Sequence, residues 1–371
     1  MVAADTLDLT ADVVTLTREL CDIPSVSGDE TRLADAVEAA LRAHPHLEVL
    51  RDGDAVVART RLGRARRVVV AGHLDTVPVT GNLPTRLEDD VLHGRGTVDM
   101  KAGVAVQLSL AAALDAPVHD VTWVFYDHEE VDASLNGLGR VARNHPDWLT
   151  ADFAVLCEPT AGGIEGGCNG TLRAEVRLQG VAAHSARAWT GVNAVHAAGE
   201  VLRRLAAYAP ATVEVEGLTF REGLNAVLIS GGRATNVIPD ECVVTVNYRF
   251  APSRTVEEAS AHVREVLAGY DVVVVDAAPG ARPGLDDPLA QDFAAAVLAV
   301  TGGRPAAKQG WTDVARFSSL GVPAVNFGPG DPLLAHTQDE HCPVGQVVAS
   351  RAALGAWLTG ARPEDLPLGL S

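Results

Sequence analysis

The chain is poor in positive charge. Its 371 residues include 30 lysines and arginines against 48 aspartates and glutamates, which gives a formal net charge of −18 at pH 7. Nucleic acids and anionic membrane surfaces attract proteins through clustered Lys and Arg side chains. We therefore expect neither a nucleic acid nor a membrane surface as a partner, and the acidity itself says nothing about the fold.

Long apolar runs are also missing. Nowhere do about 18 uncharged apolar residues follow one another, as a membrane-spanning helix requires. The first residues, MVAADTLDLTADVV, have neither the basic start nor the continuous apolar stretch of a secretory signal. These absences predict a cytoplasmic protein.

Cysteine is sparse and scattered. There are 5 cysteines, an odd number, and no C-x-x-C pair. This pattern predicts structural thiols rather than a disulfide framework or a zinc knuckle, and a catalytic cysteine is the alternative. The residues concerned are Cys21, Cys157, Cys168, Cys242 and Cys342.

The chain does contain apolar strands that alternate with helical patterns. Residues 8–20 and 30–43 have the apolar spacing of amphipathic helices, and Asp29 and Glu30 supply an acidic first turn to the second of these. The continuous apolar runs are VVVAG (68–72), VTWVFY (121–126), DFAVLC (152–157) and PAVNFG (323–328), with an Ala-rich helix at 100–114. This order predicts an α/β fold whose mixed, largely parallel sheet is flanked by helices.

The pattern changes from Thr171 to about Ala278. Here alternating strands, such as TLRAEVRLQG and ECVVTVNYRF, surround helices near 192–207 and 256–268, and the stretch PGARPGLDDP closes the region. We therefore expect residues 1–170 and 284–371 to form one domain. Residues 171–283 would form an inserted α+β domain.

Side chains that can bind metals follow each apolar run. Ligands of open α/β sheets bind where the carboxyl ends of the strands meet, so these side chains should share one rim. Converging charges are costly without a cation among them, and imidazoles with carboxylates suit zinc better than magnesium or calcium. The residues are His73, Asp75, Asp99, Asp127, His128, Glu129, Glu130, Glu158 and His336.

The number of these ligands favours two metal ions. Two ions can acidify a shared water and polarise a carbonyl oxygen, so the predicted reaction class is hydrolysis. His73 would contact a metal, and Asp75 would accept the second imidazole N–H and fix its orientation. The alternative for Asp75 is a cap on the turn before Pro78.

Eight motifs resemble one enzyme family closely. In chain order they are GHLDTVP, GRGTVDMKAG, FYDHEEV, CEPT, AHSARAWTGVNAVH, TNVIPDE, GWTDVARF and AHTQDE. They are similar to those of the succinyl-diaminopimelate desuccinylases, particularly the actinobacterial type. This group belongs to the dinuclear zinc aminoacylases and carboxypeptidases, which also include acetylornithine deacetylase, and the resemblance runs from about residue 20 to 360.

The resemblance implies a set of metal ligands. His73 and Glu158 would hold one zinc, Glu130 and His336 the other, and Asp99 would bridge them. Two Zn²⁺ ions per subunit are implied, with Co²⁺ as a substitute.

The resemblance also implies roles for residues that do not bind metal. Glu129 would be the general base, with a plain strand-end acid as the alternative. His184 would stabilise the oxyanion in the partner subunit of a homodimer, because the inserted domain would be a dimerisation domain. The Asp99–Met100 peptide would be cis.

Three further residues are implied to contact the substrate. They are Asn236, Arg249 and Arg316, and an arginine suits a substrate carboxylate. A surface or core role is the alternative for His184, and a structural ion pair is the alternative for each arginine.

The reaction implied is hydrolysis of N-succinyl-LL-2,6-diaminopimelate to succinate and LL-2,6-diaminopimelate, a step toward lysine and cell-wall precursors. The segment GGCNGTLRAE and the pair Asp132-Ala133 depart from the best-known desuccinylase pattern. Deacetylation of acetylornithine or N-acetyl-lysine, or dipeptide hydrolysis, therefore stays open. A non-catalytic metal-binding regulatory protein is a more remote alternative.

Overall fold

The computed structural model of the chain describes residues 5–361, so the first four residues of the stretch inspected for a targeting signal lie outside it. The chain divides into two compact units. The first comprises Met1–Gly166, Gly284–Ala306 and Arg316–Ser371, and the second comprises Gly167–Pro283 and Ala307–Ala315.

The segment Ala307–Ala315 departs from the boundaries expected from the sequence, which placed it in the larger domain. Gln309 Nε2 donates to Thr219 O at 3.0 Å, and Asn169 Nδ2 donates to Gln309 O at 3.0 Å. Trp311 Nε1 donates to Pro279 O at 3.1 Å. These long-range hydrogen bonds attach the segment to the second unit, and no local pattern in the sequence predicts them.

An eight-stranded sheet forms the framework of the first unit, in the order β1-β2-β6-β3-β7-β18-β8-β17. The pairs β6/β3, β3/β7 and β7/β18 are parallel, whereas β1/β2, β2/β6 and β18/β8 are antiparallel. The prediction of a mixed, largely parallel sheet is confirmed. The strands are β1 (Glu48–Asp52), β2 (Ala55–Arg59), β3 (Arg67–His73), β6 (Asp120–Tyr126), β7 (Phe153–Leu156), β8 (Glu165–Gly166), β17 (Ala306–Ala307) and β18 (Ala324–Asn326).

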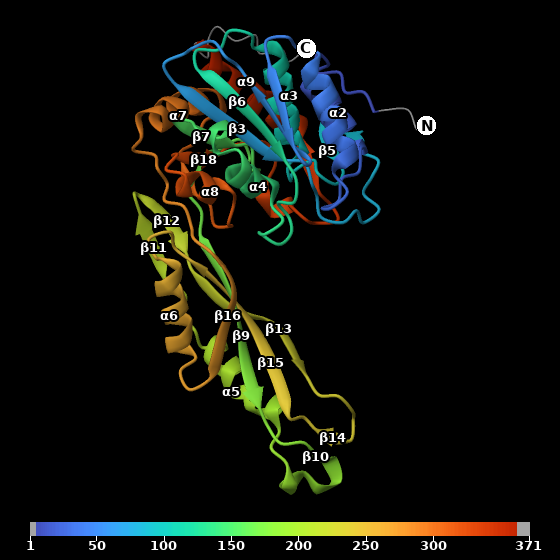
Figure 1. The fold of residues 1–371 in the computed structure, drawn as a ribbon, viewed down its shortest axis with the longest axis vertical. Coiled ribbons are helices and arrows are strands. Elements are labelled where there is room, and N and C mark those ends of the chain that lie inside the picture. Colours follow the sequence, from blue (N-terminus) through green and yellow to red (C-terminus); the bar gives the residue numbers. More distant parts are fainter. Residues whose placement is uncertain (1–4, 362–371) are drawn as a thin grey trace. The chain divides into compact units, whose positions relative to one another are not determined.

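Both faces of the central strands are buried. Val68 and Val70 of β3 belong to the large core cluster, and Val69 and Ala71, which point to the opposite face, are equally inaccessible. Helices cover this sheet (Figure 1), which explains why its strands read as continuous apolar runs. The helices of this unit are α1 (Val13–Asp22), α2 (Thr31–Arg42), α3 (Lys101–Ala113), α4 (Gly137–Asn144), α7 (Pro288–Thr301), α9 (Val344–Thr359) and, from Arg316 on, α8 (Val314–Ser319).

The first helix begins later than its apolar spacing suggested. The Asp12 carboxylate accepts the N–H groups of Val14 and Thr15, and this cap starts the helix at Val13. At its other end, the buried Lys101 Nζ donates to Leu20 O and Ile23 O, at 3.1 and 2.8 Å. Burial lowers the pKa of Lys101 to about 8. Lys101, the first residue of α3, thus binds two backbone carbonyls at the end of α1.

A second, three-stranded sheet lies in the first unit, in the order β19-β5-β4. Its strands are β4 (Arg86–Glu88), β5 (Val91–His93) and β19 (His341–Pro343). Each is only three residues long. Strands this short give no clear alternation of apolar and polar residues, so no pattern in the sequence predicts them.

The second unit has an antiparallel four-stranded sheet in the order β13-β15-β9-β16. The alternating burial of β9 and β15 places one face against α5 (Ala194–Ala206) and α6 (Val256–Val266), which share a core with it. The other face carries polar side chains. The strands of this unit are β9 (Gly170–Gln179), β10 (Ala183–His184), β11 (Thr212–Val215), β12 (Leu218–Arg221), β13 (Gly223–Gly231), β14 (Val237–Ile238), β15 (Glu241–Phe250) and β16 (Asp271–Ala278).

Three short 3₁₀ helices complete the described elements: η1 (Pro146–Trp148), η2 (Ser185–Thr190) and η3 (Pro332–Leu334). Among residues 5–361, no helix combines the length and the apolar character that crossing a bilayer demands.

Candidate metal centre

The carboxylate of Asp99 lies between two imidazoles. His73 Nε2 is 3.1 Å from Asp99 Oδ1, and His336 Nε2 is 3.2 Å from Asp99 Oδ2. His336 Nε2 also lies 2.8 Å from Glu130 Oε1. Each oxygen of one carboxylate therefore faces a different histidine, which is the arrangement that a carboxylate shared between two cations requires.

The fold explains why these residues meet. His73 ends β3, Glu130 follows β6, and Glu158 follows β7; these three strands are parallel neighbours, so their carboxyl ends share one edge of the sheet. Asp99 lies just before α3, and its peptide bond to Met100 is cis, as the resemblance implied. His336 follows η3 in the left-handed region of backbone space, at φ +64°.

The donor set fits a zinc-type cation. Two imidazoles are combined with carboxylates, whereas magnesium and calcium prefer oxygen ligands alone. Within each of three overlapping groups, the potential ligand atoms lie within 4.8 Å of one another. These groups are His73, Asp99 and Glu158; Asp99, Glu130 and His336; and His73, Glu129 and Glu130.

The imidazoles and carboxylates of the cluster shift one another's pKa values. Hydrogen bonds to Asp99 and Glu130 raise the pKa of His336 to about 10. Burial opposes the charge on Asp99, but its bonds to His336 and His73 outweigh burial and lower its pKa. Burial also opposes protonation of His73, yet the bonds to Asp75 and Asp99 raise its pKa well above the usual value. A cation that binds here must displace protons from the histidines.

Asp75 organises the residues around it. Its Oδ1 accepts from Glu129 N at 3.0 Å, and its Oδ2 accepts from Glu130 N at 3.1 Å and from Ser27 Oγ at 2.7 Å. His73 Nδ1 lies 3.0 Å from the Asp75 backbone carbonyl and 3.4 Å from Oδ1. The carbonyl is thus the nearer partner of the imidazole, and the carboxylate holds the two glutamate peptides.

Burial tends to raise the pKa of Asp75, but the contact with His73 and the other hydrogen bonds lower it to about 2. The side chain is therefore a carboxylate over the whole neutral range. It can only accept hydrogen bonds, so the orientation of the Glu129 and Glu130 peptides is defined by its two oxygens.

Glu30 has a different environment from the one its sequence position suggested. It was expected to supply an acidic first turn to α2, but it lies before Thr31, the first residue of that helix, and its side chain is wholly buried. Its oxygens accept from Gly28 N at 2.8 Å and from His128 N at 3.1 Å. Glu30 therefore holds the turn that precedes Glu129.

Glu340 and Arg95 form a buried ion pair that the sequence analysis missed. Glu340 Oε2 accepts from Arg95 Nη1 at 2.5 Å, and their side chains are 1% and 3% exposed. Glu340 Oε1 accepts from the backbone N–H groups of Gly96, Val98 and Asp99, at 2.9, 3.0 and 3.2 Å. The loop that carries Asp99 is thus fixed by a residue close to His336 in the chain. The only signal in the sequence was an acid inside AHTQDE.

The predicted substrate-contacting residues are divided between the two units. His184, Asn236 and Arg249 belong to the second unit and are exposed there. His184 Nδ1 accepts from Ala186 N at 3.1 Å, and Asn236 O accepts from Ser185 N at 2.9 Å. Arg316 belongs to the first unit, where its Nη2 lies 3.4 Å from Ala133 O.

The five cysteines are all buried and free, as predicted. Burial raises the pKa of Cys168 to about 11. A thiol in such surroundings is a poor nucleophile, because the thiolate is the reactive form.

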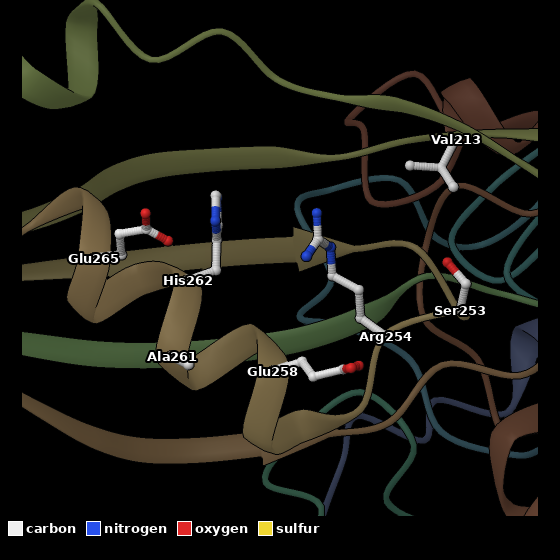
Figure 2. Close-up of a pocket in the computed structure, with 7 residues that line it drawn as sticks. All are labelled: Val213, Ser253, Arg254, Glu258, Ala261, His262 and Glu265. Carbon is white, nitrogen blue, oxygen red and sulfur yellow. The ribbon is translucent and has the colours of Figure 1, made fainter.

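A cavity of about 490 Å³ lies in the second unit (Figure 2). Arg254 Nε at its edge donates to the buried Glu222 at 2.8 Å, and His262 Nε2 lies 2.9 Å from Tyr208 Oη. It contains none of the residues predicted for the metal centre or the substrate. Its lining consists of Val213, Ser253, Arg254, Glu258, Ala261, His262 and Glu265.

Comparison with known proteins gives a consistent result. Residues 69–359 match the sequence profile of peptidase family M20/M25/M40. A protein of Mycobacterium tuberculosis described as a putative succinyl-diaminopimelate desuccinylase DapE is 56% identical, over 95% of this chain and 100% of its own length. A succinyl-diaminopimelate desuccinylase of Corynebacterium glutamicum is 48% identical, over 95% of this chain and 98% of its own.

The fold is also found among solved structures. A tripeptidase from Staphylococcus aureus superimposes with a TM-score of 0.78 at 20% sequence identity, covering 96% of this chain and 99% of its own. At that identity the likeness concerns the fold alone.

The pair of Glu340 and Arg95 provides a test of how the centre is held. Glu340→Gln should lower the free energy of unfolding by about 3–5 kcal/mol, because it leaves the Arg95 charge buried without its counter-ion. Affinity for zinc should also fall, at least about tenfold, since the Asp99 loop loses its anchor. Chemical denaturation and equilibrium dialysis measure the two effects.

The control is Glu88→Gln, which removes the carboxylate of an exposed pair with Arg86 at 3.1 Å. It should change stability by less than about 0.5 kcal/mol. Equal stability and metal content in both variants would contradict the role of Glu340.

Proposed function

Because the chain belongs to peptidase family M20/M25/M40, a family of metal-dependent hydrolases, we propose that it hydrolyses the amide bond of N-succinyl-LL-2,6-diaminopimelate. The products are succinate and LL-2,6-diaminopimelate. Support comes from the relatives at 56% and 48% identity over nearly the whole chain. The observation that carries the chemistry is Asp99, with one oxygen 3.1 Å from His73 and the other 3.2 Å from His336.

Two zinc ions per subunit are the cofactors in this proposal, and Co²⁺ can replace them. His73 and Glu158 hold one ion, Glu130 and His336 hold the other, and Asp99 is shared. The grouping of ligand atoms within 4.8 Å supports this assignment. Bound divalent ions acidify water and polarise a carbonyl oxygen.

Glu129 is the general base. It lies in a group of potential ligands with His73 and Glu130, but it is not among the five residues assigned to the two metal ions. Its carboxylate takes a proton from the attacking water and returns it to the leaving amine. Asp75 positions it, because separate oxygens of Asp75 accept the Glu129 and Glu130 N–H groups at 3.0 and 3.1 Å.

Substrate recognition is assigned to Asn236, Arg249 and Arg316. The substrate carries several carboxylates, and guanidinium groups bind carboxylates with two parallel hydrogen bonds. The net charge of −18 makes nucleic acid and anionic membrane surfaces poor partners, and we place the enzyme in the cytoplasm.

The substrate is tested by comparing turnover of the succinylated and acetylated diamino acids, acetylornithine and a dipeptide at equal concentration. The succinylated substrate should be hydrolysed fastest, with a kcat/KM at least about tenfold above the others, because a site built to pair the extra carboxylate rejects analogues without it. Activity should vanish on metal removal and return with zinc. Preference for an acetylated substrate would show that the chain is a hydrolase of the same family that removes a different acyl group.

Substitution of the two adjacent glutamates should impair the enzyme in different ways. Glu129→Gln should keep both metal ions but lose at least about 10²-fold in kcat, since it removes the proton acceptor. Glu130→Gln should weaken one metal site, because it removes a ligand. Metal analysis and steady-state kinetics on both variants separate these outcomes, and equal metal loss would refute the division.

The second unit has a surface suited to joining two copies of the chain. Strand β13 lies at the edge of its sheet, and its residues Val227, Leu228 and Ile229 are 52%, 68% and 53% exposed. Exposed apolar edge strands invite pairing with another chain. A two-fold homodimer buries them, and His184 of each chain then serves as oxyanion donor in the other subunit.

Two inactive variants should therefore complement each other. Glu129→Ala and His184→Ala homodimers are mixed, dissociated and re-paired at equal concentration. About half of the dimers become hybrids, and each hybrid has one complete site, so activity should recover to roughly a quarter of wild type. Hybrids that form but show no more activity than their parents would remove His184 from the trans role.

A further inference from the structure

Two histidines face each other on the small sheet of the first unit. His93 ends β5 and His341 begins β19, and the register of the two strands places them directly opposite each other. Their ring centroids are 5.1 Å apart, with an angle of 33° between the ring planes. Asp339 adds a carboxylate, and one potential ligand atom from each of the three residues lies within 4.8 Å of the others. None of the three belongs to the metal centre around Asp99.

We propose that His93, His341 and Asp339 form a third metal site, which takes a divalent cation of the zinc, nickel or copper class. Imidazole is a preferred ligand of these ions, and one carboxylate completes a mixed nitrogen and oxygen set. Three protein ligands leave a further coordination position for water.

The local structure prepares His341 for this role. Its Nδ1 lies 2.6 Å from the Asp339 backbone carbonyl and 3.8 Å from Asp339 Oδ2, so Asp339 fixes the orientation of the ring. Histidines that bind metals commonly donate their other ring N–H to a carbonyl in this way. The His341 and Asp339 side chains are 27% and 83% exposed, so a cation can enter from solvent.

The two strands also hold the imidazoles at a suitable spacing. Residues directly opposite each other in an antiparallel pair have Cβ atoms about 4.5–5.5 Å apart, so little side-chain entropy is lost when one ion binds both rings. The positive charge nearest in register is Arg86 on β4, opposite His93, and its guanidinium is paired with Glu88 at 3.1 Å.

The site lies close in the chain to the metal centre but is separate from it. β5 leads from His93 into the loop that carries Asp99, and the turn before His341 leads back to His336. The carboxylate of Glu340, next to His341, already accepts hydrogen bonds from backbone N–H groups of the loop that carries Asp99. A cation at this site would tie β5 to β19 and would use none of the ligands proposed for the metal centre.

The test counts zinc ions on the metal-free, full-length protein by isothermal titration and by metal analysis after dialysis. Wild type should bind one more ion per chain than His93→Asn or His341→Asn. Asp339→Asn should keep the site with at least about tenfold weaker affinity. With Cu²⁺ as the probe, the nitrogen hyperfine pattern of two imidazoles should be lost in each histidine variant.

The matched control is His44→Asn. His44 and His46 also form a close pair, with ring centroids 5.9 Å apart, but neither belongs to a metal-binding group among the described residues. The number of zinc ions bound by His44→Asn should equal the number bound by wild type. All variants should keep the two ions of the centre around Asp99 and a kcat within about twofold of wild type, which separates this site from the proposed activity. The same ion count in wild type and both histidine variants would overturn the proposal.

Discussion

The sharing of one carboxylate between two imidazoles is the constraint on which the rest of the first unit depends. Asp99 faces His73 with one oxygen and His336 with the other, so three distant segments must meet within hydrogen-bonding distance. Further carboxylates, those of Glu130 and Glu158, lie in the same cluster. Negative charges gathered at the edge of an apolar sheet are costly unless cations compensate them. Because the edge of this sheet brings such charges together, its geometry suits the binding of cations.

Rigidity comes from carboxylates outside the set of proposed metal ligands. Asp75 holds the Glu129 and Glu130 peptides, Glu30 holds the turn before them, and Glu340 holds the Asp99 loop while it pairs with Arg95. All are buried acceptors that bind backbone N–H groups. Such groups fix loop geometry more firmly than apolar packing does, because a displaced N–H would be left unpaired in a dry environment. The proposed metal ligands are consequently held in place by bonds that do not involve an ion.

The two units have separate cores. The first contains the proposed metal ligands and the base, and its sheet is buried on both faces. The second has its own core beneath one face of an antiparallel sheet, and it carries His184, Asn236 and Arg249 on its surface. The residues proposed for the chemistry and most of those proposed for recognition therefore lie on separate units.

The sequence by itself determined the central strands, the helices around them and the rim on which the proposed metal ligands lie. Continuous apolar runs such as residues 68–72 are local signals, and the histidine and acids that follow them could be assigned to one edge by topology alone. Only the tertiary structure decided what Glu30, Glu340 and Ala307–Ala315 do. Their partners are distant in the chain: Glu340 binds Arg95 and Asp99, and Gln309 binds Thr219. A buried charge and an exposed one look alike in a sequence, because burial depends on which distant residues pack against the side chain.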